Sequence, residues 1–209
     1  MSFPFAAAFR ETLAQRLADF PRLSHADDGP RRAAVVLALT AADDGSGETS
    51  FLLTRRASGL RAHPGQWALP GGRCDPGETE AEAGLRELEE ELGLPRTSAE
   101  VLGVLDDYVT RSGYAMTPVV AWLAETAALA PNPQEVASAH VIRLDGLQAP
   151  DAVSFLTIPE SPRPVIRLRI APGSHIHAPT AAVIYQLSEL AAGRVTRVAD
   201  LEQPVFAWR

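Results

Sequence analysis

The sequence predicts one α/β domain in which β-strands outnumber α-helices. Several short apolar runs are each bounded by turn residues, which is the pattern of buried strands. Two or three other segments repeat their apolar residues every ~3.6 positions, as helices do. The chain has 209 residues, of which 46% are hydrophobic, so it can bury a substantial core. We therefore expect residues 1–209 to form a single domain rather than two small ones.

The first predicted element is a helix over about 5–20. Phe5, Phe9, Leu13 and Leu17 recur every four residues and form one stripe of an amphipathic helix. This stripe is expected to pack on the domain. Charged residues interrupt the segment, which argues against a secretory signal and makes an organellar transit peptide the less favoured alternative. The expected location is therefore cytoplasmic.

The predicted strands and the last helix follow along the chain. The strands are expected at 33–40, 50–56, 101–109, 114–125, 136–144 and 164–170. The first two are joined by a loop rich in Asp and Gly, which is a hairpin signal. The segment 179–193 has the helical period, with Pro at its start and Gly at its end. It is therefore expected to be a helix.

A third helix is predicted in the most acidic part of the chain. Thr79 and Glu82 form the Thr-x-x-Glu pattern of a capping box. Strong helix formers run from Ala81 to Leu92, and Gly93 is a natural C-terminal stop. The helix should therefore begin near Thr79 and end before Gly93.

Negative charge is concentrated in and around this helix. Residues 72–94 hold eight acidic residues and two arginines, so they carry −6 of the formal net charge of −7. Glu87, Glu90 and Glu91 are spaced i, i+3, i+4 and share one helix face. Like charges this close destabilise the helix unless a divalent cation such as Mg²⁺ or Mn²⁺, which prefers oxygen ligands, binds them. The alternative is an ordinary solvated acidic face.

The same residues match the Nudix box, and the chain resembles a Nudix hydrolase. The box reads Gly, five residues, Glu, seven residues, then Arg-Glu-aliphatic-x-Glu-Glu-x-Gly-aliphatic. Every defined position is present: Gly72, Glu78, Arg86, Glu87, Leu88, Glu90, Glu91, Gly93 and Leu94. The resemblance implies a Nudix fold, an α/β architecture with a mixed β-sheet sandwiched between α-helices. It also implies hydrolysis of a nucleoside diphosphate linked to another group.

The resemblance further implies roles for the box residues. The metal ligands would be three glutamates and a backbone carbonyl, namely Glu87, Glu90, Glu91 and Gly72 (or Gly71). Arg86 would orient the glutamates, and Glu78 would be mainly structural and could pair with Arg86. The general base is left open between a box glutamate such as Glu87 and Glu135, which lies on a later loop.

Residues before the box resemble a second signature, that of the coenzyme A diphosphatase branch of the family. The matching positions are Leu52, Leu53, Thr54, Arg56, Arg61, Gly65, Pro70, Gly71 and Gly72. Ala57 replaces Ser and Leu69 replaces Phe, which puts the choice of substrate in doubt. The branch implies cleavage of CoA or acyl-CoA to 3′,5′-ADP and (acyl-)4′-phosphopantetheine. NADH or ADP-ribose is the alternative substrate.

CoA carries a 3′-phosphate apart from its diphosphate, so its recognition needs cations besides the metal. The sequence has no lysine, so these cations must be arginines. Arg56 and Arg61 flank a glycine-containing loop before the box, and Arg111 lies on a second loop; their guanidinium forks suit phosphate oxygens. Together with the backbone of Gly71 they are the predicted substrate-binding residues, although each could be a simple surface arginine.

Composition and the remaining residues exclude other classes. A pI near 5.2 argues against a general nucleic-acid binder. No apolar run approaches the ~20 residues of a membrane helix. His175 and His177 alternate and could face one pocket, yet a zinc site lacks further ligands. A nucleotide sensor without activity is disfavoured because all three box glutamates remain. The expected partner is a small molecule, and the N-terminal stripe could serve a homodimer or cover the sheet.

Overall fold

A computed structural model describes residues 1–25, 31–60, 63–123, 128–171 and 173–208. In this part of the chain, eight strands form a mixed sheet with the order β3-β2-β1-β7-β5, to which β4, β6 and β8 add. The strands are β1 (Arg31–Ala41), β2 (Thr49–Arg56), β3 (Trp67–Ala68), β4 (Gly71–Arg73), β5 (Ala99–Val104), β6 (Tyr108–Val109), β7 (Tyr114–Leu123) and β8 (Val136–Arg143). β1 and β7 are parallel, and the other pairs are antiparallel.

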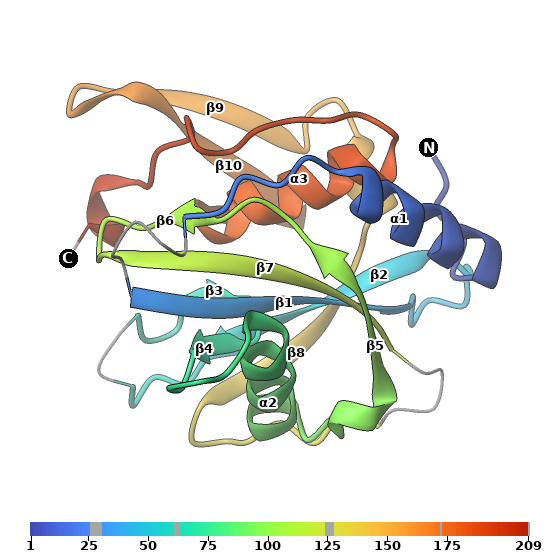
Figure 1. The fold of residues 1–209 in the computed structure, drawn as a ribbon. Coiled ribbons are helices and arrows are strands. Elements are labelled where there is room, and N and C mark those ends of the chain that lie inside the picture. The colour runs from blue at the N-terminus through green and yellow to red at the C-terminus, as the bar shows by residue number, and fades with distance from the viewer. Residues whose placement is uncertain (26–30, 61–62, 124–127, 172, 209) are drawn as a thin grey trace.

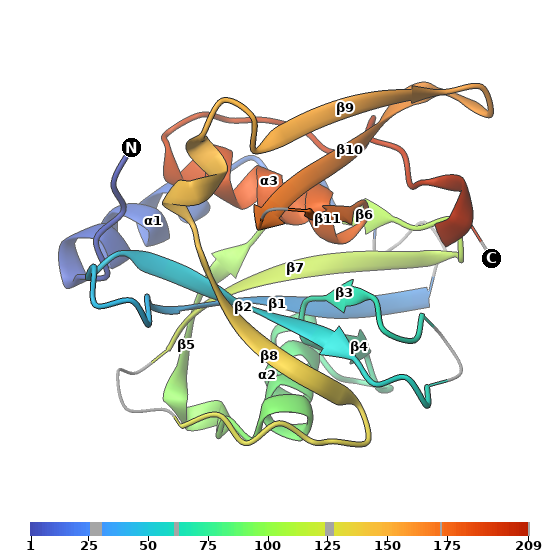
Figure 2. The ribbon, with the colours of Figure 1, turned by 180° about the vertical axis from the view of Figure 1, so that it is seen from behind.

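The helices cover both faces of this sheet. They are α1 (Ala7–Asp19), α2 (Glu80–Leu92) and α3 (Thr180–Ala191), with short 3₁₀ turns η1 (Arg96–Ser98), η2 (Asp145–Gln148) and η3 (Val205–Ala207). Figures 1 and 2 show α2 against one face and α1 and α3 beyond the other. This arrangement confirms the predicted α/β architecture with a mixed sheet between helices.

A second, antiparallel sheet lies on the side of α3. It has the order β11-β10-β9 and consists of β9 (Val153–Ile158), β10 (Ser161–Ala171) and β11 (Ser174–His177). Only β10 was expected from the sequence. β9 and β11 are short and partly exposed, so they lack the continuous apolar run that marked the buried strands.

The acidic helix forms as the sequence predicts. The hydroxyl of Thr79 accepts a hydrogen bond from the amide of Glu82, whose carboxylate accepts one from the amide of Thr79 at 2.8 Å. Gly93 ends the helix in the left-handed conformation, with φ of 67°. The backbone of α2 comes close to the sheet at Gly84, where a Cβ would lie 2.9 Å from Val36 Cγ2.

The predicted strand 101–109 is wrong as one element, because the chain leaves the sheet between β5 and β6. Asp106 and Asp107 fall in this break and are buried. Asp106 accepts a hydrogen bond from the amide of Leu23 at 2.7 Å, and Asp107 accepts one from the amide of His25 at 2.7 Å. The two carboxylates therefore hold the segment after α1 and cannot continue a regular strand.

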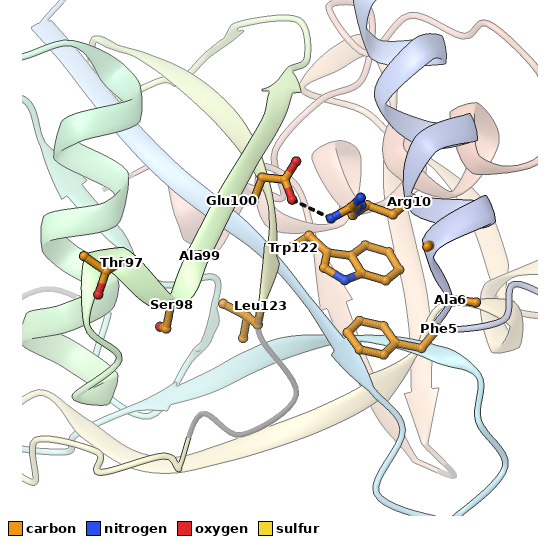
Figure 3. Close-up of a pocket in the computed structure, with 10 residues that line it drawn as sticks. Phe5, Ala6, Arg10, Thr97, Ser98, Ala99, Glu100, Trp122 and Leu123 are labelled. Carbon is orange, nitrogen blue, oxygen red and sulfur yellow. Dashed lines mark hydrogen bonds and ion pairs between the residues drawn. The ribbon is translucent and has the colours of Figure 1, made fainter.

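The N-terminal helix packs its apolar stripe on the sheet. Leu13 and Leu17 are buried in the larger core cluster. Figure 3 shows the start of this segment at a pocket of about 370 Å³, where Phe5 stacks on Trp122 with 4.2 Å between ring centroids. The stripe is thus used within the chain, and a homodimer stays a prediction, as does the single domain.

No helix in the described part of the chain is long and apolar enough to cross a bilayer.

Replacing the cap residue tests the helix. Thr79→Ala removes the hydroxyl acceptor of the capping box and should lower the free energy of unfolding by about 1 kcal/mol in urea denaturation. Thr12→Ala is the control, because Thr12 lies exposed inside α1 and should change stability by less than about 0.5 kcal/mol. Equal effects of the two substitutions would contradict a capping role.

Candidate active site

The site is built where β4 meets α2. Gly72 lies directly beside Glu87, since a Cβ on Gly72 would stand 2.2 Å from Glu87 Oε1. Gly71 is enclosed on another side, because its Cβ would lie 2.3 Å from the carbonyl oxygen of Ala34. A side chain at Gly71 would collide with the backbone of β1, and one at Gly72 would displace the carboxylate of Glu87. The backbone of β4 therefore reaches the carboxylates of α2 directly.

Arg86 connects the loop before α2 to the helix. Its Nε and a terminal nitrogen donate to the two oxygens of Glu78 at 3.0 and 3.1 Å. It also donates to Glu87 Oε1 at 2.8 Å and to the carbonyl of Arg73 at 2.9 Å. The expected pairing of Glu78 with Arg86 is confirmed. Hydrogen bonding from Arg86 lowers the pKa of Glu78, and the Glu78 bond raises the pKa of Arg86, so both stay charged.

Burial destabilises the negative charge of the next carboxylate, that of Glu91. Glu91 is only 5% exposed, and burial together with the charge of Glu87 raises its pKa to about 8. A backbone hydrogen bond with Gly71 and the charge of Arg56 oppose this rise without cancelling it. Burial also raises the pKa of Glu87. The charge of Glu135 adds to both shifts, so its carboxylate lies close to this pair.

These groups fit a hard divalent cation by their chemistry. The donors are carboxylate oxygens next to a glycine backbone, and burial raises the free energy of their negative charge. Among the described residues, no three side chains already converge as a metal site. Glu87 and Glu90 instead accept hydrogen bonds from Arg86, and the side chain of Glu90 is 54% exposed. The exposed side chain of Glu90 can turn to a cation while Arg86 keeps its bonds to Glu78 and Glu87.

The structure brings two further predicted residues to this region. Glu135 lies in the turn before β8, and its carbonyl accepts a hydrogen bond from the amide of Ala57 at 2.8 Å. Arg56 ends β2, and its charge acts on Glu91. Arg61 lies outside the described residues.

Arg111 is placed differently. It donates to both oxygens of Glu202, at 3.1 and 2.5 Å, and its guanidinium lies 4.5 Å from the ring centroid of Trp208. Glu202 is buried and also accepts from Arg163 at 2.6 Å. The guanidinium of Arg111 is thus directed at the C-terminal segment, while its loop neighbours Thr110 and Ser112 line the adjoining cavity.

A cavity of about 750 Å³ opens beside Gly71 and Gly72. Its lining includes Arg31, Arg56, Arg73, His175, His177, Trp67, Tyr114 and Phe206. The main sheet supplies one wall, and β11 with the C-terminal segment supplies the other. The alternation of His175 and His177 did indicate a shared pocket. Phe206 and Gln203 were missed, because nothing local in the sequence shows that the C-terminus returns to the end of β7 (Figure 1).

A known protein-family model covers the segment that holds the glycines and the acidic helix. A NUDIX domain model matches residues 29–160. The chain belongs to the Nudix family. Members of this family are hydrolases that cleave phosphorus-containing anhydrides of small molecules and generally use divalent metal ions.

Curated Nudix relatives match about three fifths of the chain. Nudix hydrolase 3 of Caenorhabditis elegans is 37% identical over 131 residues, which are 61% of this chain and 53% of that protein. The uncharacterized Nudix hydrolase NudL of Photorhabdus laumondii is 36% identical over 132 residues, 63% of this chain and 68% of that protein. The chain thus spans about half the length of the C. elegans relative.

A solved Nudix structure supports the fold. RenU, a Nudix hydrolase from M. smegmatis, aligns with a TM-score of 0.50 and 26% sequence identity. The alignment covers 80% of this chain and 91% of that chain. The predicted Nudix fold is therefore confirmed.

Stability should depend on pH through Glu202. Burial pushes the pKa of Glu202 up, but hydrogen bonds from Arg111 and Arg163 outweigh it and hold the pKa at about 2, below the ordinary 4.5. The stabilisation is therefore complete above pH 4.5 and lost as the pH falls toward 2. Glu202→Gln should lower the free energy of unfolding by about 3 kcal/mol at pH 7, and by less below pH 4.5.

Denaturation in urea at pH 7 and at pH 3.5 measures this difference. Glu89→Gln is the matched control, because Glu89 forms an exposed pair with Arg96 worth less than about 1 kcal/mol. If the difference in the free energy of unfolding between wild type and Glu202→Gln stayed constant with pH, the stabilising role of the ionised Glu202 carboxylate would be contradicted.

Proposed function

We propose that this protein hydrolyses the diphosphate of coenzyme A or acyl-CoA to 3′,5′-ADP and (acyl-)4′-phosphopantetheine. The observation that carries the proposal is that Gly72, which lies against the box carboxylate Glu87, lines a large cavity whose walls hold arginines and aromatic rings. A diphosphate would lie at Gly71 and Gly72, and the remainder of a large, polyanionic substrate would occupy the cavity. The upstream signature favours CoA among the diphosphates that could do so.

The box glutamates Glu87, Glu90 and Glu91, with the carbonyl of Gly72 or Gly71, would hold Mg²⁺ or Mn²⁺. When bound, the cation would supply Lewis-acid stabilisation of the phosphoryl oxygens and lower the pKa of a bound water. Arg86 would keep Glu87 in place through the 2.8 Å hydrogen bond, acting as a positioning residue.

Two groups are suited to take the proton of the attacking water. The charge of Glu135 acts on both Glu87 and Glu91. A box carboxylate such as Glu87 is the other. Arg56 lines the cavity beside Glu91 and would bind a phosphate oxygen, and the backbone of Gly71 would lie against the diphosphate.

A different diphosphate, NADH or ADP-ribose, is the second candidate. It is favoured by the two departures from the signature. Leu69 lines the cavity, and because leucine is smaller than the phenylalanine of the signature, the shape of the pocket changes at this position. Ala57 is buried, and its amide binds the carbonyl of Glu135, so the missing hydroxyl lies beside a candidate base.

Turnover of a substrate panel tests the activity. We expect CoA to be cleaved faster than NADH or ADP-ribose in the presence of Mg²⁺ or Mn²⁺, with 3′,5′-ADP identified by chromatography. Glu91→Gln should reduce kcat/KM by about a hundredfold or more, because it removes a buried anionic ligand. Glu89→Gln, an exposed neighbour on the same helix, should keep the wild-type rate. Cleavage of NADH or ADP-ribose with CoA intact would transfer the proposal to the second candidate.

Metal binding can be measured without turnover. Mn²⁺ should raise the Tm of the wild type by a few degrees, and EDTA should reverse the shift, because a ligand that binds only the folded state stabilises it. The shift should be largely lost in Glu91→Gln and retained in Glu89→Gln. Equal shifts in all three proteins would place the cation elsewhere.

A further inference from the structure

Two arginines lie at the ring of one tyrosine in the wall of the cavity. The guanidinium carbon of Arg31 lies 4.0 Å from the ring centroid of Tyr114, and that of Arg73 lies 5.5 Å from the same centroid. All three residues line the cavity. Tyr114 is half-buried, whereas Arg31 and Arg73 are both exposed. The ring thus holds two positive charges at one place.

The sheet register places this group. On the paired strands β4 and β1, Arg73 lies opposite Ala33. On the paired strands β1 and β7, Arg31 lies opposite Tyr114. Because side chains alternate along a strand, Arg31 shares a face with Ala33 and therefore with Arg73 and Tyr114. Three neighbouring strands present the group on the cavity face of the sheet.

The two guanidiniums differ from other arginines of the protein. Arg32, Arg86 and Arg111 each pair with a glutamate. In the part of the chain that the structure describes, neither Arg31 nor Arg73 has a carboxylate partner. Arg31 donates to the carbonyl of Ser112 at 2.7 Å, which fixes its direction without neutralising its charge. Two such forks at one ring suit a dianion with several acceptor oxygens.

We propose that Arg31, Tyr114 and Arg73 bind a phosphate monoester carried on the same ribose as the cleaved diphosphate, which in CoA is the 3′-phosphate. The inference rests on the proposed function and deepens it. Arg73 directly follows Gly72, and its carbonyl accepts a hydrogen bond from Arg86 at 2.9 Å. Arg73 therefore lies within the box, next to the glycine at which the diphosphate is placed, which suits two phosphates on one sugar. Arg111, by contrast, already neutralises Glu202.

The test compares substrates and ligands that differ by one phosphate. In the wild type, kcat/KM for CoA should exceed that for 3′-dephospho-CoA by about tenfold or more, the contribution of a charge-assisted contact. Arg31→Gln and Arg73→Gln should each lower this ratio several-fold, and the double variant should bring it near one. Arg96→Gln, on the surface near the end of α2, is the control and should keep the wild-type ratio.

A binding measurement separates the subsite from the chemistry. Calorimetry in EDTA should show that the wild type binds 3′,5′-ADP about tenfold more tightly than 5′-AMP. The double variant should bind the two nucleotides with equal affinity. Equal binding of the two nucleotides by the wild type would overturn the subsite. So would variants that slow CoA and 3′-dephospho-CoA by the same factor. Failure of the wild type to cleave either substrate, with the binding preference intact, would instead overturn the proposed function and leave a phosphate subsite.

Discussion

The burial of Glu91 against Glu87 is the constraint on which the site depends. A helix would be more stable with an apolar residue at a position that is 95% buried, yet this one carries a carboxylate whose pKa is raised to about 8. The surrounding sequence limits the cost. Arg86 lies against Glu87 and Glu78, and the backbone of Gly71 reaches Glu91. The neighbouring groups therefore reduce the electrostatic repulsion between Glu87 and Glu91 without removing it. A bound divalent cation would compensate the remaining negative charge.

The two glycines join the two halves of the site. Gly72 faces the carboxylates of α2, and Gly71 lies against the backbone of β1. Both also line the cavity. One short backbone segment thus contacts both the acidic residues of α2 and the cavity. A side chain at Gly71 would collide with β1, and one at Gly72 would displace the carboxylate of Glu87, so the absence of side chains is what lets this backbone lie so close to both.

Local signals explain most of what the sequence predicted well. The capping box, the glycine stop and the i, i+3, i+4 glutamates all act within a few residues, so α2 and its charge pattern follow from short-range rules. The parts that the sequence did not reveal depend on distant contacts. Asp106 and Asp107 interrupt a strand because they bind the chain after α1, which lies more than eighty residues earlier. Arg111 was expected at a phosphate, but Glu202, ninety-one residues later, takes its guanidinium.

The same reasoning locates substrate choice in the least family-like part of the chain. The box and its helix, which hold the proposed hydrolytic groups, lie within residues 29–160, which match the Nudix model. The second wall of the cavity comes from β11 and from the segment around Gln203 and Phe206, beyond that match. Glu202 anchors this wall, since it is buried among Arg111, Arg163 and Ser161. A cavity closed by a segment outside the family core can change its ligand without altering the glutamates. We therefore infer that, on the proposed function, the choice among diphosphates depends on the packing around Glu202 as well as on the signature before the box.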